Sequence, residues 1–175
     1  IVHEDVYDEF IKLIKEKAEN LKMGEGKDNL PFNAVISQSA FSSITKYIEQ
    51  GKKEGKLITG GNYDDSKGFY IEPTIFIDVD PSTAVIAKEE IFGPVLAVMK
   101  FKTFEEAIKI ANDTPYGLTG SVYTKNGDHI NIAKDLFHVG NLYINRKSTG
   151  AVVGHHPFGG YNMSGTTAKT GTRDY

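Results

Sequence analysis

Cysteine is absent from this sequence of 175 residues. Disulfide bonds, thiolate metal sites and cysteine nucleophiles are therefore excluded within these residues. Disulfides are rare in a reducing cytosol, so the lack of cysteine agrees with a cytoplasmic location, which we expect for the protein. Long apolar runs are also lacking, and no stretch approaches the roughly 20 apolar residues that a membrane-spanning helix needs. We therefore expect no membrane partner.

Charge of one sign is equally scarce. The 20 Lys and Arg residues nearly balance the 23 Asp and Glu residues, which gives a net charge of −3, and both signs are mixed along the chain. The densest basic run, residues 51–56, is short and contains Glu54, so it predicts a solvated turn. Because no basic patch or stripe is visible, a nucleic-acid partner is not expected.

Apolar periodicity predicts an alternation of helices and strands. The predicted helices cover residues 5–23, a segment opened by Ser37 or Ser39 and running to residue 50, residues 104–114, and residues 128–137. The predicted strands cover residues 1–3, 56–59, 69–80, 95–101, 121–124 and 141–144. This order favours an α/β fold, with a mostly parallel sheet and flanking helices. The length suits one globular domain.

Local signals set the expected ends and faces of these elements. Thr103 and Glu106 form a capping box for the third helix. Gly24 and Gly51 are expected just beyond the ends of the first two helices. Pro73 is expected to confine its strand to a sheet edge or a bulge. The first helix is expected to bury one face, made of Val6, Phe10, Leu13, Ile14 and Leu21.

The segment from Lys88 to Val95 combines two acids, an aromatic residue and a Gly-Pro turn before a predicted strand. Glu90 could accept hydrogen bonds from both hydroxyls of a ribose, because one carboxylate can accept two such bonds. Phe92 could lie against a flat ring. The residues alone leave a structural alternative open, in which a surface acid precedes a core phenylalanine.

A second segment, residues 145–160, lies within a glycine-rich part of the chain. Five glycines fall within the 16 residues from 150 to 165, which predicts a long irregular functional loop at residues 146–165. Small residues with free backbone N–H groups, such as the run Ser148-Thr149-Gly150-Ala151, can form a nest for an anion such as a carboxylate. A flexible linker is the alternative that the residues leave open.

Together these motifs resemble the aldehyde dehydrogenase superfamily in sequence, order and spacing. They are Glu89-Glu90-Ile91-Phe92-Gly93-Pro94-Val95, then Asn112-Asp113-Thr114-Pro115-Tyr116-Gly117-Leu118, then Pro157-Phe158-Gly159-Gly160. The resemblance covers essentially the whole chain. It implies that residues 1–175 are the C-terminal part of a Rossmann-like catalytic domain that ends in a substrate-anchor loop at 146–165. Residues 143–151, followed by 157–160, resemble the branch that oxidises 1-pyrroline-5-carboxylate, the cyclic form of L-glutamate 5-semialdehyde.

The resemblance implies a role for each matching residue. Glu90 would hold the nicotinamide ribose of NAD, and Phe92 would position the nicotinamide. Gly150 and Ala151 would bind the α-carboxylate of the substrate through their backbone amides. Phe158 would line the aldehyde tunnel.

The implied activity is NAD-dependent oxidation of a small-molecule aldehyde, L-glutamate 5-semialdehyde, to L-glutamate in proline catabolism, by a homo-oligomeric enzyme. In this family a cysteine thiolate attacks the aldehyde, and a glutamate activates water for hydrolysis of the thioester. The resemblance places that cysteine shortly upstream of Ile1 and the glycine-rich NAD fold further upstream. We therefore expect a fragment without a catalytic residue of its own, and no dehydrogenase activity from these residues alone.

The neighbouring His155 and His156 raise the question of a metal site. Adjacent side chains point apart on extended backbone, and no partner four residues away and no acid completes a ligand set. We therefore expect no metal site. The resemblance assigns Asn145, at the end of the last strand, a structural role.

Two alternatives to this function stay open. The chain could be a non-catalytic binding or interaction module that kept the fold and lost the chemistry. Retention of Glu90, Phe92 and the Gly150-Ala151 loop together favours the enzyme. The second alternative is an aldehyde dehydrogenase for another semialdehyde, such as succinate semialdehyde, which changes only the interpretation of the loop.

Overall fold

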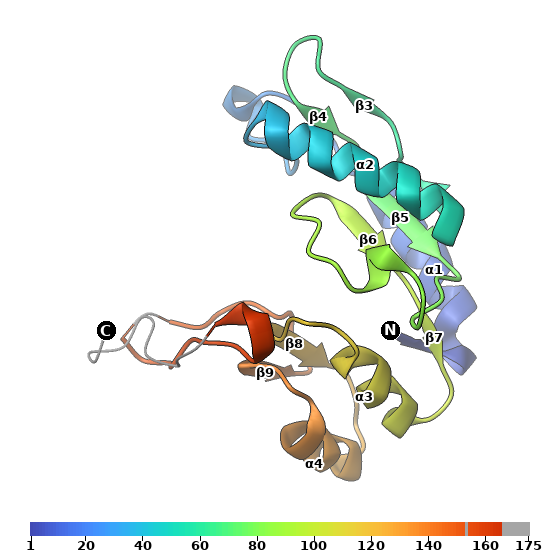
Figure 1. Ribbon diagram of the computed structural model, residues 1–175, viewed down its shortest axis with the longest axis vertical. Helices are drawn as coiled ribbons and strands as arrows, with labels where there is room; N and C mark the ends of the chain where they lie inside the picture. The colour runs from blue at the N-terminus through green and yellow to red at the C-terminus, as the bar shows by residue number, and fades with distance from the viewer. Residues whose placement is uncertain (153, 166–175) are drawn as a thin grey trace. The chain divides into compact units, whose positions relative to one another are not determined.

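The computed structural model describes residues 1–152 and 154–165. The chain forms two compact units, Ile1–Lys102 and Thr103–Tyr175, each of which contains helices and parallel strands (Figure 1). This arrangement confirms the α/β class predicted from the alternation of helix and strand patterns. No helix within the described residues is long and apolar enough to cross a membrane.

The first unit contains two long helices and several short strands. Its elements are β1 (Val2–His3), α1 (Glu4–Glu19), the 3₁₀ helix η1 (Gly26–Asp28), α2 (Gln38–Glu54), β2 (Lys56–Thr59), β3 (Tyr63–Asp64), β4 (Tyr70–Ile71), β5 (Thr74–Ile77), the 3₁₀ helix η2 (Val85–Ala87), β6 (Val95–Ala97) and β7 (Lys100–Phe101). Strand β5 lies between antiparallel β2 and parallel β6, β1 pairs with β7 in parallel, and β3 and β4 form an antiparallel pair. The strand predicted at 95–101 is thus two strands with different partners.

Helix α1 buries a different face from the one predicted. Tyr7 is only 2% exposed and packs with Ile75, Ile77 and Val98. The predicted face was therefore wrong at four positions, since the structure leaves Val6, Phe10, Leu13 and Leu21 exposed. The predicted face and the buried face of α1 are offset by one residue, from Val6 to Tyr7. Tyrosine can join a core when its hydroxyl finds a partner. The Tyr7 hydroxyl lies 3.1 Å from the backbone nitrogen of Asp78, which donates to it.

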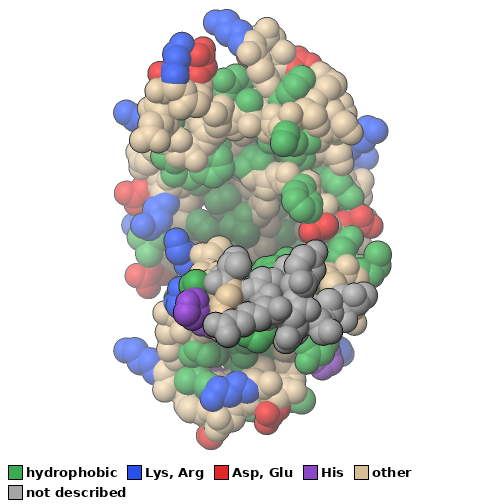
Figure 2. Space-filling view, turned by 90° about the vertical axis from the view of Figure 1, so that its left-hand side faces the viewer, with side chains coloured by type: hydrophobic (Ala, Val, Ile, Leu, Met, Phe, Trp, Pro, Cys, Tyr) green, Lys and Arg blue, Asp and Glu red, His purple; other side chains and the backbone are tan. Residues whose placement is uncertain are grey.

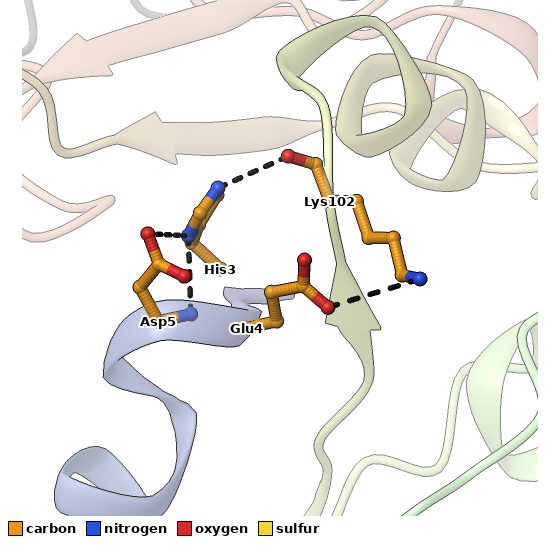
Figure 3. Close-up of polar contacts among 4 residues, drawn as sticks. All are labelled: His3, Glu4, Asp5 and Lys102. Carbon is orange, nitrogen blue, oxygen red and sulfur yellow. Dashed lines mark hydrogen bonds and ion pairs between the residues drawn. The ribbon is translucent and has the colours of Figure 1, made fainter.

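The start of α1 is fixed by His3, the residue before the helix. The Nδ1 atom of His3 accepts a hydrogen bond from the backbone N–H of Asp5 at 3.2 Å, and its Nε2 atom lies 3.0 Å from the carbonyl oxygen of Lys102 (Figure 3). The backbone N–H of Asp5 can only donate, so Nδ1 of His3 accepts and carries no hydrogen. The ring hydrogen is therefore on Nε2, which donates to the carbonyl oxygen of Lys102. Glu4 adds an ion pair to Lys102 at 4.0 Å, so the two ends of the first unit are tied together. The helix ends at Glu19 with Asn20 as its cap, so the prediction that it runs to Met23, with Gly24 just beyond its end, was wrong.

Helix α2 begins as predicted and ends later than predicted. The hydroxyl of Ser37 accepts a hydrogen bond from the backbone N–H of Ala40 at 3.1 Å, which selects Ser37 as the cap. Phe41, Ile44 and Ile48, which lie on one face of the helix, are buried. Gly51 lies inside the helix and is buried. Since it has no side chain, the helix can approach the ring of Phe76 closely at this position. The prediction that Gly51 ends the helix was therefore wrong.

Pro73 does not place its strand at a sheet edge. Strand β5 begins at the next residue, Thr74, and is the central strand of its sheet. Because the proline precedes the strand, the N–H that it lacks is not needed between the paired residues. All four residues of β5 are buried, and the Thr74 hydroxyl accepts a hydrogen bond from the backbone N–H of Gly61 at 2.9 Å. The prediction of an edge strand was wrong, because Pro73 lies just before the strand. The pairing of β5 with β2 does contain a register shift, between Leu57 and Thr59 of β2.

The second unit is built around two parallel strands connected through a helix. Its elements are α3 (Phe104–Asn112), β8 (Thr119–Val122), α4 (Gly127–Leu136), β9 (Asn141–Ile144) and the 3₁₀ helix η3 (Asn162–Ser164). Ile108, Val122 and Ala133 form its buried core. The Thr103 hydroxyl accepts from the backbone N–H of Glu106 at 3.2 Å, as the capping box predicted. Strand β9 has its predicted bounds, while β8 begins two residues earlier than predicted.

Candidate functional site

The first candidate segment, the 88–94 loop, follows η2 and is supported by helix α2. Glu54 of α2 accepts a hydrogen bond from the backbone N–H of Ile86 at 3.1 Å. Partial burial raises the pKa of Glu54, but hydrogen bonds from Gln50 and from the backbone of Ile86 and Val85 outweigh it and hold the pKa below its ordinary value. The carboxylate is therefore charged at neutral pH and fixes the start of the segment.

The loop contacts α2 at two further positions. The Tyr47 hydroxyl donates a hydrogen bond to Oε2 of Glu89 at 2.9 Å. A Cβ atom at Gly93 would lie 2.6 Å from Cγ2 of Ile44, so only glycine fits there without displacing a buried side chain. The loop is thus held against the helix before it enters β6.

Glu90 and Phe92 lie on this loop and point away from the core. Glu90 is exposed and forms no hydrogen bond or ion pair with the residues that the structure describes. Phe92 is 82% exposed and has a positive φ of 54°. Its exposure contradicts the alternative of a core phenylalanine. Figure 2 shows exposed apolar side chains on the face of the first unit that is turned toward the viewer.

The positive φ of Phe92 is uncommon for a bulky residue and costs free energy, of the order of 1–3 kcal/mol. Such a conformation persists only when the surrounding structure imposes it. Here Gly93, packed on Ile44, and Glu89, bonded to Tyr47, fix the loop on both sides. The result is an aromatic ring presented to solvent next to a carboxylate with no partner among the described residues.

The second candidate segment, the 146–165 loop, begins at the end of β9. Asn145 has a φ of 55°, and its side chain bonds to both the N–H and the carbonyl of Thr124 at 2.9 Å. These bonds join the ends of β8 and β9, which supports the structural role expected for Asn145. The Ser121 hydroxyl also donates to the backbone carbonyl of Arg146.

Gly150 has a φ of 122°, a conformation that other residues rarely adopt. The Arg146 guanidinium lies beside Gly150: a Cβ atom added to Gly150 would lie 2.5 Å from Nη2 of Arg146. That nitrogen donates to the backbone oxygen of Thr149 at 3.3 Å. Gly150 is exposed and Ala151 is half-buried, so a small anion can approach this backbone closely.

The later part of this loop is anchored to β9 and to the segment that precedes β8. The Asn141 side-chain amide donates to the carbonyl oxygen of Pro157 at 3.1 Å. The Ser164 hydroxyl accepts from the backbone N–H of Gly117 at 2.9 Å. Phe158, next to Pro157, is half-buried. Since Asn141 and Ser164 lack a motif of their own, sequence reasoning did not identify them as supports of the loop.

The two neighbouring histidines lie in a turn. The backbone N–H of Val152 donates to Nδ1 of His156 at 3.0 Å, and the N–H groups of His155 and His156 both donate to the carbonyl of Val152. Within the described residues, no group of three metal-ligating side chains is present.

The structure therefore groups the expected site residues in two places. Glu90 and Phe92 lie on one loop of the first unit, and Gly150, Ala151 and Phe158 lie on one loop of the second unit. Sequence reasoning missed the support of Glu89 by Tyr47. The helical spacing of Ile44, Tyr47 and Ile48 could have indicated a shared face, but no local signal pairs Tyr47 with a loop 42 residues later.

Comparisons with known proteins match the chain over its whole length. A family model described as aldehyde dehydrogenase family matches residues 1–175. The 1-pyrroline-5-carboxylate dehydrogenase of Bacillus licheniformis is 57% identical over 176 residues, which cover 100% of this chain and 34% of the relative. The structure of 1-pyrroline-5-carboxylate dehydrogenase from Thermus with bound NAD has a TM-score of 0.94 at 47% identity and covers 99% of this chain and 34% of that chain. Aldehyde dehydrogenase 21 from Physcomitrella patens, in complex with the reaction product succinate, has a TM-score of 0.84 at 34% identity, over 97% of this chain and 36% of that chain.

These comparisons agree with the motifs and with the fold. The chain spans about a third of the length of the relatives that it matches, as the 34% coverage shows. Within that third, the sequence identity and the similarity of fold both support membership of one family. This chain is a member of the aldehyde dehydrogenase family.

Proposed function

We propose that this chain forms the C-terminal part of the catalytic domain, ending in the substrate-anchor loop at 146–165, of an NAD-dependent aldehyde dehydrogenase. We further propose that the enzyme oxidises L-glutamate 5-semialdehyde, the open form of 1-pyrroline-5-carboxylate, to L-glutamate. The chain contributes groups that bind the cofactor and the substrate. It contains no cysteine, so the thiolate that the family uses as a nucleophile is not among these residues.

The observation that carries the proposal is the presentation of Glu90 and Phe92 on one loop. An exposed carboxylate without a partner among the described residues suits the two hydroxyls of a ribose, since it can accept a hydrogen bond from each. An aromatic ring that is 82% exposed on an unfavourable backbone conformation suits stacking on a flat ring. These residues fit the nicotinamide-ribose end of NAD, which is present in the Thermus relative. When bound, NAD supplies the two-electron oxidant for the aldehyde.

The substrate proposal depends on the segment around Gly150. L-Glutamate 5-semialdehyde carries an α-carboxylate far from its aldehyde, and burial of that charge without a partner would cost several kcal/mol. Backbone N–H groups at Gly150 and Ala151 can bind it, because neither residue has a side chain large enough to obstruct the approach. Phe158, half-buried on the same loop, supplies an apolar wall. The name of the Bacillus licheniformis relative supports this choice over succinate semialdehyde.

Two further expectations from the resemblance belong to the same proposal. We propose that the complete enzyme is a homo-oligomer, the common state of soluble enzymes that assemble. We also propose that it acts in the cytoplasm. Size-exclusion chromatography with light scattering, and fractionation of the source cells, test these two statements.

The activity can be tested in a chimaera in which these 175 residues replace the third of the Bacillus licheniformis relative that they match. The rest of that relative supplies what this chain lacks. Formation of NADH is followed by absorbance with L-glutamate 5-semialdehyde, succinate semialdehyde and propanal as substrates. Preference for L-glutamate 5-semialdehyde supports the proposal. Folded chimaera that oxidises none of them favours a non-catalytic module, and preference for succinate semialdehyde favours the other semialdehyde.

Ala151→Asp tests the anchor within that chimaera. The added carboxylate should repel the α-carboxylate of the substrate and fill its place, so kcat/KM for L-glutamate 5-semialdehyde should fall by at least about 10²-fold, close to 3 kcal/mol. Propanal, which has no carboxylate, should lose much less. Ala151→Ser is the matched control, because it adds similar polarity without charge. Equal losses on both substrates would mean that the substitution damages the fold, and no loss would remove the anchor from the proposal.

A further inference from the structure

Helix α2 presents one row of side chains to the segment that contains Glu90 and Phe92. Ile44, Tyr47 and Glu54 are spaced by three and seven residues, which places them on one face of the helix. Their partners follow in the reverse order along the chain: Gly93 packs on Ile44, Glu89 accepts from Tyr47, and Ile86 donates to Glu54. The loop therefore runs antiparallel to the helix and contacts it at three levels.

The middle contact separates two neighbouring acids. Glu89 and Glu90 have the same side chain, and either carboxylate could bind a diol. The Tyr47 hydroxyl donates to Glu89 at 2.9 Å, whereas Glu90 has no partner among the described residues. A carboxylate that already accepts from a fixed hydroxyl is less available to a ligand, and its neighbour is left available.

We propose that Tyr47 is a positioning residue for the cofactor, which holds Glu89 on helix α2 so that Glu90, and not Glu89, meets the ribose of NAD. Tyr47 acts through the loop and does not itself touch the ligand. This proposal rests on the proposed function of the Glu90–Phe92 pair. Without the hydroxyl, the loop keeps its flanking contacts at Gly93 and Ile86, but Glu89 loses the partner that holds it on the helix, and both carboxylates can compete for the ribose.

The test uses the chimaera defined above and the variant Tyr47→Phe, which removes the hydroxyl and keeps the ring. We expect the Kd for NAD, measured by calorimetry, and the KM for NAD to rise by about 3–10-fold, the loss of one partly exposed hydrogen bond to a charged group. The KM for the aldehyde and the thermal midpoint should stay unchanged. Tyr63→Phe is the matched control, since Tyr63 lies in the same unit and is 42% exposed, and it should leave all four quantities unchanged.

A second pair of variants tests whether Tyr47 acts through Glu89. Glu89→Gln keeps an acceptor for the hydroxyl and should weaken NAD binding less than Glu89→Ala does. Tyr47→Phe and Glu89→Ala together should weaken it no more than the stronger single variant, because both remove the same contact. Fully additive losses would overturn the proposal, as would an unchanged Kd for NAD in Tyr47→Phe.

The outcomes separate this inference from the proposed function. An active chimaera whose NAD affinity is unaffected by Tyr47→Phe refutes the positioning role alone. A chimaera that binds NAD with the expected dependence on Tyr47, but oxidises no aldehyde, supports the positioning role and refutes the proposed reaction. Equal increases in the KM for NAD and for the aldehyde, with a lower thermal midpoint, would show that Tyr47 is merely structural.

Discussion

Gly51→Ala should destabilise the first unit, although alanine is the better residue for a helix interior. Gly51 lies within α2, between Gln38 and Glu54. In an exposed helix, replacing glycine by alanine stabilises by about 1 kcal/mol. At this position the added methyl group meets the ring of Phe76, which is 0% exposed in the central strand of the sheet.

The geometry gives the size of the effect. The Cβ atom would lie 2.6 Å from Cε2 of Phe76, 2.8 Å from Cζ and 3.0 Å from Cδ2. Carbon atoms pack best at about 3.5–4.0 Å, so the ring or the helix must move by about 1 Å. Overpacking of this kind typically costs about 1–3 kcal/mol. After subtraction of the helix preference, we expect a net loss of about 1 kcal/mol for Gly51→Ala.

Gly127→Ala is the matched control. Gly127 is the first residue of α4, and apart from its chain neighbours and the backbone of its own helix, no atom of the described residues lies within 4 Å of the place that the added methyl group would occupy. There the exchange should stabilise by about 0.4–1 kcal/mol through the unfolded state. Both free energies of unfolding are measured on the purified chain by urea denaturation. Circular dichroism is the suitable probe, since the chain contains no tryptophan. If Gly51→Ala raises the free energy of unfolding as Gly127→Ala does, the ring of Phe76 can move aside at little cost. Close packing against Phe76 then does not explain why glycine occupies position 51.

Two further predictions concern the same unit. Tyr7→Phe should lower the free energy of unfolding by about 1–2 kcal/mol, because the backbone N–H of Asp78 loses the hydroxyl that lies 3.1 Å away; Tyr123→Phe, at a position 69% exposed, should change it by less than about 0.5 kcal/mol in the same urea titration. Glu54 has a folded-state pKa below its ordinary value, so it stabilises the fold above its unfolded pKa, and this contribution is lost as the pH falls through the folded pKa. Glu54→Gln should therefore lower the urea midpoint at about pH 7 and change it little at about pH 3. An equally large change at both pH values would contradict the link between the pKa of Glu54 and stability.

Strong local signals predicted the elements that depend on few neighbours. Strand β9 has its predicted bounds, and α2 begins at Ser37, one of the two serines that the sequence offered. Errors arose where a distant residue decides the outcome. Tyr7 is buried because Asp78 supplies a partner for its hydroxyl, and Gly51 continues its helix because Phe76 occupies the space beside it. Neither partner can be found from the helix sequence.

The candidate site shows the same division. Motifs identified Glu90 and Phe92, but they left open whether the phenylalanine is buried, which the exposed ring on left-handed backbone answers. The 146–165 loop was identified by its small residues, whereas the residues that support it were not. Asn141 reaches Pro157 across 16 residues, and such a contact depends on how the strand and loop pack rather than on local spacing.

The pairing of β1 with β7 has a consequence for how the chain is made. Val2 and His3 pair with Lys100 and Phe101, so these two residues leave the ribosome about a hundred residues before their strand partners do. At a synthesis rate of about 5–20 residues per second, this interval lasts roughly 5–20 s. During it, helix α1 has no completed core to cover, since Val98 joins Tyr7, Ile75 and Ile77 only at the end. We therefore expect the first unit to fold late in its own synthesis, which makes its nascent form a substrate for chaperones that bind exposed apolar segments.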